Sequence, residues 1–467
     1  MKYYLMIDIG ASSGRHMLGH MEDGKIVYEE IHRFTMAQGI WKWHYGVLFH
    51  DIIDGMIKCR EAGKIPVSMG IDTFGVEPCY LGKYGDPLEV GAMLRDNLGM
   101  QAAFSEKRFS FMDSREMYER TGCPDMAGNF IYQMLFAKEK YPSMYDKIAK
   151  VLTMPDFLNY LLTGEIKSEY SFATTSGLVS LATNNWDSEV IEAAGIAPEM
   201  FVDLTMPGTF VGRLKPELRE RVGYDIDVLQ VASHDSASAN ISAPVRDDDS
   251  ILISSGTWSI VGAESYTPMT TDKSFKYGIH NEGNMGLRHR ILKNMTGTIM
   301  MQRVRRDYGE RYSYDDLENM AKEAADFPSR VDVVNRSLTF SDNTMEEIVR
   351  GYCRETSQPV PETLPDVLKC IYQSMAAGYK EIISALEDCF GKKFTSINLF
   401  SGGSKDMYLN QLTANATGIP VYAGPTEAAT VGNMLVQMIY DGTLGGLAEA
   451  KELVGRSFEI KLIEPEN

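Results

Sequence analysis

Short apolar runs, each ending in small or polar residues, recur along the chain. They cover residues 3–7, 67–73, 228–232, 251–253 and 397–400. Runs of this length are typical of strands buried on both faces, as in the parallel sheets of α/β proteins. Because open α/β sheets bind ligands where such strands end, the polar residues after each run are candidates for a functional site.

Longer segments place apolar residues three and four positions apart and predict amphipathic helices. The clearest spans residues 365–390 and ends at Gly391, and its apolar stripe indicates core packing. Residues 130–165 are also predicted to be helical, with a break at Pro142 and a stop at Gly164.

Shorter elements are predicted around these. Residues 15–20 and 25–32 continue the first strand as a meander, and residues 236–242 form a short helix. Residues 424–427 open a last helix, in which Gly432 allows close packing.

Two glycine turns, about 245 residues apart, look like copies of one device. Residues 8–15 follow the first apolar run, and residues 255–259 follow the run at 251–253. Glycines at 10 and 14 permit positive φ and close approach by a ligand, while N–H and hydroxyl groups hold phosphate oxygens. Alone, the first turn could equally be a tight hairpin, and it matches neither the Walker nor the Rossmann pattern. The two copies predict a phosphoryl-transfer enzyme with two related lobes.

Asp235 lies between the two turns, where residues 228–232 lead into a predicted helix. In phosphoryl transfer a carboxylate orients the attacking hydroxyl and accepts its proton. The helix N-terminus would favour the ionised carboxylate. The alternative is that Asp235 is a plain N-cap, a position that favours Asp. A third turn, residues 401–404, could pass under an adenine or ribose, although Gly-Gly turns are common loops.

Length and charge narrow the class of protein. The 467 residues favour two domains, which we expect at residues 1–243 and 244–467. The net charge of −18 argues against nucleic acid or an anionic membrane as a partner. No signal peptide or bilayer-spanning apolar run is evident, so a cytoplasmic location is expected. Nothing in the sequence indicates the oligomeric state.

Cysteine and histidine positions give no metal cluster. Six cysteines without a C-x-x-C pair are expected to be reduced thiols, although a Cys353–Cys370 bridge is possible. His16 and His20 have no further ligand nearby and are expected to be surface or packing residues. A site for a hard cation remains open, and Asp8, at the end of the first strand, suits a magnesium ion held through water.

Several segments together resemble the FGGY family of carbohydrate kinases, within the actin/Hsp70/hexokinase superfamily, and among its members the rhamnulokinases. The matching segments are residues 10–15, 31–34, 154–156, 233–239, 254–259, 292–294, 353–356, 358–359 and 423–428. The resemblance implies an α/β fold of two ribonuclease-H-like domains that flank a central catalytic cleft. It also implies ATP, Mg²⁺ and a small sugar as ligands.

The resemblance assigns roles residue by residue. Asp235 would be the general base, and Asp8 would lie near the metal ion. The ATP-binding residues would be Ala11, Ser12, Ser13, Gly14, Arg15, Thr257, Gln302, Gly402 and Gly403. The residues facing the sugar would be Gly75, Glu77, His234, Ser236 and Asn294.

Two segments depart from the rhamnulokinase pattern. In the family's Gly-Ile-Asp-Thr-Trp-Gly-Val-Asp this chain has Phe74 for Trp and Glu77 for Asp. Residues 94–99 lack the family's aromatic residue and second arginine. The expected acceptor is L-rhamnulose, phosphorylated at C1, with L-fuculose or another 6-deoxy-ketose as the alternative. A nucleotide-gated binding protein and a sugar-sensing regulator are the alternatives from other classes, and the binding protein predicts no sugar-stimulated turnover.

Overall fold

The chain divides into two compact units in a computed structural model that describes residues 1–10, 13–35, 45–88, 106, 110–244, 247–335, 338 and 343–466. The first unit comprises Met1–Ser242, Ser265–Ile291 and Ala429–Ser457. The second comprises Ala243–Glu264, Leu292–Ala428 and Phe458–Asn467.

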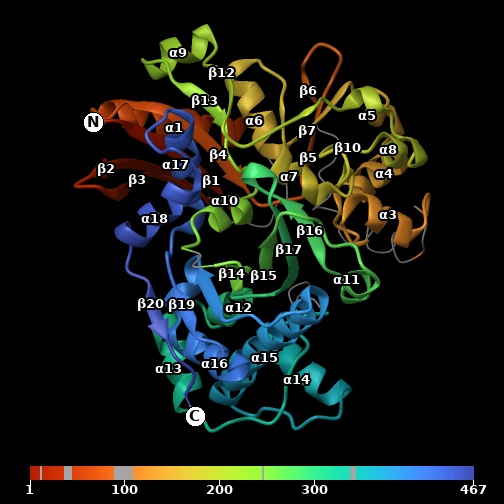
Figure 1. Ribbon diagram of the computed structural model, residues 1–467, viewed down its shortest axis with the longest axis vertical. Coiled ribbons are helices and arrows are strands. Elements are labelled where there is room, and N and C mark those ends of the chain that lie inside the picture. The colour runs from red at the N-terminus through yellow and green to blue at the C-terminus, as the bar shows by residue number, and fades with distance from the viewer. Residues whose placement is uncertain are drawn as a thin grey trace. The chain divides into compact units, whose positions relative to one another are not determined.

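A six-stranded mixed sheet of order β12-β13-β4-β1-β2-β3 lies in the first unit (Figure 1). Its strands are β1 (Tyr3–Ile9), β2 (Ser13–Glu22), β3 (Lys25–Thr35), β4 (Pro66–Thr73), β12 (Thr209–Arg213) and β13 (Asp227–Gln230). Strand β4 runs parallel to β1 and β13. Strands β1, β2 and β3 are successively antiparallel, which confirms the predicted meander.

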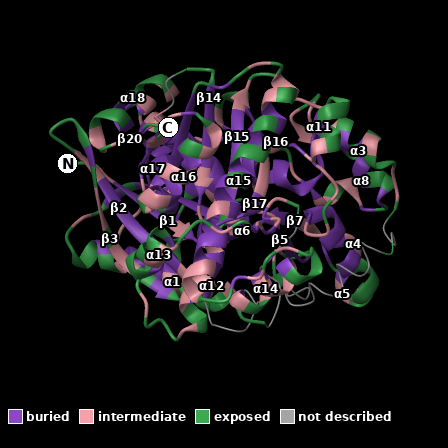
Figure 2. Cartoon of the chain, turned by 90° about the horizontal axis from the view of Figure 1, so that it is seen from below, coloured by how far each residue is buried: buried purple, intermediate pink, exposed green. Residues whose placement is uncertain are grey.

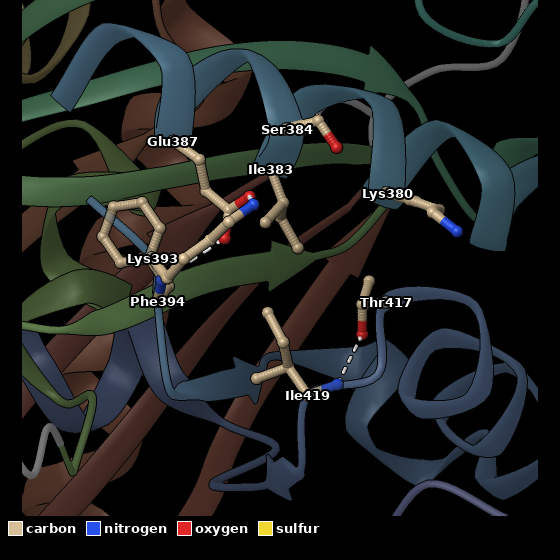
Figure 3. A pocket seen from close by; sticks show the side chains of 8 residues that line it. All are labelled: Lys380, Ile383, Ser384, Glu387, Lys393, Phe394, Thr417 and Ile419. Carbon is tan, nitrogen blue, oxygen red and sulfur yellow. Dashed lines mark hydrogen bonds and ion pairs between the residues drawn. The ribbon is translucent and has the colours of Figure 1, made fainter. Parts of the chain in front are cut away.

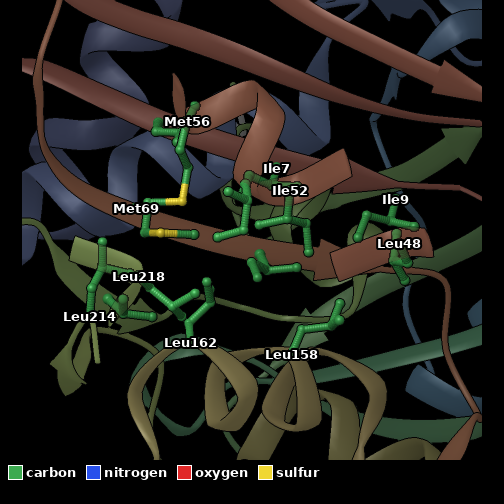
Figure 4. Packing of buried hydrophobic residues seen from close by; sticks show 14 of the residues in the cluster. Ile7, Ile9, Leu48, Ile52, Met56, Met69, Leu158, Leu162, Leu214 and Leu218 are labelled. Carbon is green, nitrogen blue, oxygen red and sulfur yellow. The ribbon is translucent and has the colours of Figure 1, made fainter. Parts of the chain in front are cut away.

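One face of this sheet carries an apolar core. Ile7 of β1 and Met69 of β4 pack with Ile52 of α1 (Tyr45–Glu61) and Leu158 of α6 (Met154–Thr163) (Figure 4). Since successive side chains of a strand point to opposite faces, the neighbouring positions face away from this core. Gly164 ends α6 in a left-handed conformation, as predicted.

The other face of the sheet receives α17 (Ala428–Tyr440). Asn433 of this helix donates hydrogen bonds to Gly70 O at 3.1 Å and Asp72 Oδ2 at 2.6 Å. A Cβ atom at Gly432 would lie 1.7 Å from Ser238 O. This confirms the close packing predicted for Gly432.

Further elements of the first unit surround the sheet. The helices are α3 (Ser114–Thr121), α4 (Phe130–Lys140), α5 (Pro142–Tyr145), α7 (Tyr170–Ala173), α8 (Ser188–Ala193), α9 (Pro216–Val222), α10 (Asp235–Ile241), α11 (Asp272–Tyr277) and α18 (Leu447–Ser457). The strands are β5 (Pro78–Leu81), β6 (Pro87–Leu88), β7 (Lys150–Thr153), β8 (Ser168–Glu169), β9 (Val179–Ser180), β10 (Asn185–Trp186), β11 (Leu204–Thr205) and β16 (His280–Gly283).

Two helix predictions are wrong in part. Residues 130–165 are not helical throughout, because β7 separates α5 from α6 and pairs antiparallel with β5. The pairing partner lies some seventy residues earlier, so the local pattern does not reveal it. The helix that follows residues 424–427 is also not the last, since α18 comes after it.

The other large sheet has the order β16-β17-β15-β14-β18-β19-β20 (Figure 1). Its remaining strands are β14 (Ser250–Ser255), β15 (Trp258–Ser265), β17 (His289–Thr296), β18 (Ser396–Phe400), β19 (Val421–Ala423) and β20 (Lys461–Ile463). The helices of the second unit are α12 (Ile299–Asp307), α13 (Tyr314–Glu323), α14 (Met345–Glu355), α15 (Leu364–Phe390) and α16 (Met407–Thr417). Helix α15 confirms the long predicted helix, and Gly391 ends it in a left-handed conformation.

The two sheets repeat one topology. Strand β1 is antiparallel to β2 and parallel to β4, which is parallel to β13, which is antiparallel to β12. Strands β14, β15, β18, β19 and β20 repeat these relations in the same order. Each glycine turn joins the corresponding antiparallel pair, so the sequence-based prediction of two related halves is confirmed.

Burial follows this architecture, with buried residues concentrated in the strands and in the inward sides of helices such as α15 (Figure 2). All six cysteines, including Cys353 and Cys370, are free, and five are buried. Of the helices that the structure describes, none has the length and apolarity needed to cross a bilayer.

Candidate active site

Asp235 is the first residue of α10, after the segment that continues β13. This segment runs beside the end of β4, where Thr73 N donates to Ser233 O at 2.9 Å. The Asp235 carboxylate accepts a hydrogen bond from Ser236 N at 2.5 Å. His234 occupies the N-cap position, so Asp235 is not the plain N-cap that its local sequence allows.

Burial raises the pKa of Asp235 above its ordinary value. His234, the Ser236 N–H and Arg290 oppose this shift, whereas Asp8 adds to it. Burial therefore opposes the effect expected of the helix N-terminus on this carboxyl. A carboxyl with a raised pKa accepts a proton more readily than one with an ordinary pKa.

The imidazole of His234 is enclosed on several sides. A Cβ at Gly75 would lie 3.1 Å from its Nε2, and the Phe172 ring meets it edge-on at 6.2 Å between centroids. The Ser236 hydroxyl lies within 3.1 Å of both ring nitrogens. The structure therefore brings Gly75, His234, Asp235 and Ser236 together.

Two buried carboxyls hold the segment that carries His234 and Asp235. Glu169 Oε2 accepts from Ser233 N at 3.1 Å and from Phe172 N at 3.0 Å. Asp156 Oδ2 accepts from Glu169 N at 3.0 Å, and burial raises the pKa of Asp156 to about 7. Asp156, in the motif at residues 154–156, thus supports this segment through Glu169. Glu169 was not among the residues predicted from the sequence.

Glu77 is 3% exposed, and burial raises its pKa to about 8. The preceding residue, Val76, has a φ of 69°. This left-handed conformation is strained for a β-branched residue. Gln133 of α4 fixes it by donating a hydrogen bond to Val76 O. The loop after β4 is therefore held in one conformation, with the Glu77 carboxyl inside the first unit.

The first glycine turn closes with a hydrogen bond from Gly10 N to Ser13 O at 3.0 Å. Neither Gly10 nor Gly14 has a positive φ, so this reason for the glycines is wrong. A Cβ at Gly14 would lie 2.0 Å from the Phe34 ring, so packing excludes a side chain there. Ala11, Ser12 and residues 94–99 lie outside the described residues.

Asp8 and Arg15 face each other across β1 and β2. Arg15 Nη2 lies 2.8 Å from Asp8 Oδ2. Asp72 is the register partner of Asp8 on β4, and burial together with the charge of Asp8 raises the pKa of Asp72 well above its ordinary value. Asp72 was not among the predicted site residues, because only the pairing of β1 with β4 brings it beside Asp8.

The second glycine turn lies in the second unit and rests on the start of α12. Gly256 N donates to Trp258 O at 3.1 Å, which closes the turn. Thr298 N and Ile299 N donate to Gly256 O and Thr257 O at 2.9 and 3.2 Å. The side chain of Thr257 is exposed.

The other predicted nucleotide-side residues of this unit adjoin the turn. Gln302 Nε2 donates to Thr298 Oγ1 at 3.4 Å. A Cβ at Gly403 would lie 2.0 Å from Ser255 Oγ, whereas one at Gly402 would meet nothing within 4 Å. The structure thus groups Thr257, Gln302, Gly402 and Gly403, and leaves the space beside Gly402 open.

Asn294 of β17 belongs to the second unit. Its buried Oδ1 accepts no hydrogen bond from the described part of the chain. A pocket of this unit is lined by Lys380, Ile383, Ser384, Glu387, Lys393, Phe394, Thr417 and Ile419 (Figure 3). None of these is a predicted site residue.

Comparison with known proteins gives two family matches that together cover most of the chain. Residues 3–242 match the N-terminal domain of the FGGY family of carbohydrate kinases, and residues 251–440 match its C-terminal domain.

Three full-length relatives are named rhamnulokinase. The chain is 40% identical to a rhamnulokinase of Halalkalibacterium halodurans over 99% of this chain and 98% of the relative. It is 36% identical to a rhamnulokinase of Oceanobacillus iheyensis, over 98% and 97% of the two chains. A rhamnulokinase of Bacillus subtilis is 35% identical, over 99% and 96%.

Solved structures share the fold. A ligand-bound xylulose kinase of Lactobacillus acidophilus matches with a TM-score of 0.77 and 17% identity, over 100% of this chain and 94% of the other. A Plasmodium falciparum glycerol kinase with ADP matches with a TM-score of 0.75 and 12% identity, over the same shares. The two-domain, ribonuclease-H-like fold is thereby confirmed.

Proposed function

Because the chain belongs to the FGGY family of carbohydrate kinases, a family that uses ATP to phosphorylate sugars, we propose that it phosphorylates the C1 hydroxyl of L-rhamnulose. The full-length relatives named rhamnulokinase support this acceptor. The observation that carries the reaction class is the partly buried carboxyl of Asp235, held at the start of α10 between His234 and Ser236.

Asp235 acts as the general base. Its carboxylate accepts the proton of the C1 hydroxyl as the sugar oxygen bonds to the γ-phosphorus of ATP, and the bond from that phosphorus to the bridging oxygen breaks to release ADP. His234, Ser236 and Gly75 orient the sugar, and Glu77 sits in the loop that follows β4. Asn294 binds the sugar through the Oδ1 that no described residue satisfies.

Nucleotide binding belongs to the two glycine turns. Thr257, Gln302, Gly402 and Gly403 contact ATP in the second unit, and the open space beside Gly402 leaves room for a ligand. The first turn contributes Ala11, Ser12, Ser13, Gly14 and Arg15. We assign sugar binding to residues 1–243 and most nucleotide contacts to residues 244–467.

Mg²⁺ fits the oxygen donors of the first unit. Asp8 keeps one carboxylate oxygen beyond its Arg15 contact, and Asp72 has a buried Oδ1 that no described residue satisfies. Among the described residues no three His, Cys, Asp or Glu side chains converge to hold an ion by themselves. Asp8 would therefore hold the ion through water, and the ion would neutralise charge on the phosphate oxygens.

A coupled ADP-release assay with Mg-ATP and a panel of ketoses tests this function. The panel is L-rhamnulose, L-fuculose, L-ribulose and D-xylulose. We expect the highest kcat/KM with L-rhamnulose. Absence of ketose-stimulated ADP release across the panel would overturn the proposal.

L-Fuculose is the second candidate acceptor, and Glu77 is the observation that favours it. Glutamate is about one methylene longer than the aspartate that rhamnulokinases carry there, so its carboxyl group would meet a sugar hydroxyl at a different position. Glu77→Asp is expected to change the ratio of kcat/KM for rhamnulose and fuculose by a few fold to about tenfold, since one hydrogen bond is at stake. An unchanged ratio would remove Glu77 from sugar selection.

A further inference from the structure

Behind His234 lies a buried ion pair that the predicted site does not contain. Glu282 of β16 and Arg290 of β17 are 4% and 3% exposed. Arg290 Nη2 donates to Glu282 Oε2 at 2.5 Å. Both residues belong to the first unit, as Asp235 does.

Both partners of this pair also reach the sugar-facing residues. Arg290 Nη1 donates to Ser236 Oγ at 3.0 Å, and Arg290 Nη2 lies 3.3 Å from His234 Nδ1. Glu282 Oε2 lies 3.5 Å from the same Nδ1. The other ring nitrogen, His234 Nε2, lies 3.6 Å from Asp235 Oδ1. The contacts thus run from the ion pair, through His234 and Ser236, to Asp235.

The ionisation of Glu282 agrees with this arrangement. Burial acts to raise the pKa of Glu282, but the charge of Arg290 and the contact with His234 outweigh it and hold the pKa at about 2. Glu282 is therefore an anion at neutral pH, and its carboxylate competes with the Arg290 guanidinium for the Nδ1 atom of His234. Because one partner of the pair can accept a proton from Nδ1 and the other can donate to it, the balance between them controls which ring nitrogen of His234 carries the proton.

We propose that Glu282 and Arg290 are positioning residues of the kinase, which fix the tautomer and orientation of His234 and the rotamer of Ser236 beside Asp235. This inference rests on the proposed function for its kinetic consequences. A buried ion pair is a poor source of stability, because desolvation offsets much of its attraction. In this pair Arg290 also donates to Ser236 Oγ, and both partners lie within 3.5 Å of His234 Nδ1, which a purely structural pair would not require.

Three variants with one control test the kinetic consequence. Glu282→Gln removes the charge, Glu282→Asp keeps it, and Arg290→Lys loses the two-pronged guanidinium. The control is Arg120→Gln, which breaks the Arg120–Asp187 ion pair, another pair within the first unit that has no contact with His234. Steady-state kinetics with ATP and L-rhamnulose and the unfolding temperature are measured for each.

We expect Glu282→Gln and Arg290→Lys to lower kcat by about 10- to 100-fold, since small misplacements of reacting groups have effects of this order. The KM for ATP should stay within about twofold of wild type, and Glu282→Asp should recover part of the kcat. Arg120→Gln should lower the unfolding temperature without this loss of kcat. Equal kcat losses in Arg120→Gln and Glu282→Gln would reduce the pair to a structural role and overturn the inference.

NMR of His234 tests the inference without any turnover. The chain has eight histidines, so carbon-13 labelling of histidine rings gives few signals, and His234→Asn identifies that of His234. In Glu282→Gln, or in Glu282→Asp if the former does not fold, we expect the tautomer-sensitive ring shifts of His234 to change while those of His16 and His32 stay. An unchanged His234 signal would overturn the inference. If wild type phosphorylates no ketose, the proposed function fails, yet this measurement still decides the role of Glu282.

Discussion

At the scale of single residues, burial raises the pKa of three acidic side chains in the first unit. It raises the pKa of Glu77 to about 8 and of Asp156 to about 7, and it raises that of Asp235 against the opposing pull of His234 and Arg290. The carboxyls differ in what surrounds them. Asp235 has the His234 ring beside it on the same segment, whereas burial alone accounts for the raised pKa of Glu77.

Glu77 makes stability depend on pH. An unfolded chain releases the Glu proton near pH 4.3, whereas the folded protein holds it up to about pH 8. Below the lower value the carboxyl is protonated in both states and does not change the free energy of unfolding. Between the two values the free energy of unfolding falls as pH rises, by at most about 1.4 kcal/mol per pH unit. Glu77→Gln cannot ionise, so its stability relative to wild type should increase steadily from pH 5 to pH 8.

Urea unfolding of wild type and Glu77→Gln at several pH values measures this difference. Glu61→Gln serves as the control, because Glu61 is an exposed residue at the end of α1. Parallel pH profiles for wild type and Glu77→Gln would show that the Glu77 carboxyl titrates normally and would contradict its burial.

At the scale of elements, close approach of backbones decides where glycine is required. Helix α17 passes α10 so closely that a methyl group at Gly432 meets the backbone oxygen of Ser238. Because backbone cannot move aside as a flexible side chain can, Gly432→Ala should lower the free energy of unfolding by about 1–3 kcal/mol or more.

Gly455→Ala is the matched control for this substitution. Gly455 is an exposed glycine within α18, and a Cβ there would meet nothing within 4 Å. Alanine favours the helix, so this variant should gain up to about 1 kcal/mol. Denaturant unfolding of both variants checks the pair, and equal effects of the two substitutions would mean that α17 and α10 are not in close contact.

The elements also show what the sequence could predict. Apolar runs and helical periodicity were sufficient for β1, β4, β14 and α15, because these signals are local. Strand β7 escaped, since its strand character comes from pairing with β5. The site divides in the same way. Short motifs predicted His234, Asp235 and Ser236, whereas Glu282 and Arg290 meet them only through the strand arrangement.

Distance along the chain limited the prediction most at Asp72. Its hydrogen-bond partner Asn433 lies 361 residues later, on a helix that returns to the first unit. Nothing local to either residue indicates such a contact. Positions of this kind become visible only when the strand order is known.

At the scale of the whole molecule, one topology occurs twice, and we assign the two halves different ligands. Hydrogen exchange followed by mass spectrometry measures this division, because bound ligand protects nearby amides from exchange. With ATP alone, we expect protection at residues 254–258 and 401–405 of the second unit. With the ketose alone, we expect it at residues 233–236 of the first unit. Protection of residues 233–236 by the ketose would support sugar binding beside Asp235. Its absence would show that the sugar binds at another place.

The central claim is that Asp235 removes the proton from the attacking sugar hydroxyl, and Asp235→Asn tests it most directly. Asparagine keeps the size of the side chain but cannot accept the proton, so kcat should fall on the order of 10²- to 10⁴-fold. Calorimetry on the same variant should give dissociation constants for ATP and L-rhamnulose close to those of wild type. Loss of turnover with both ligands still bound is the result we predict. Near-normal turnover would contradict the assignment of Asp235 as the base.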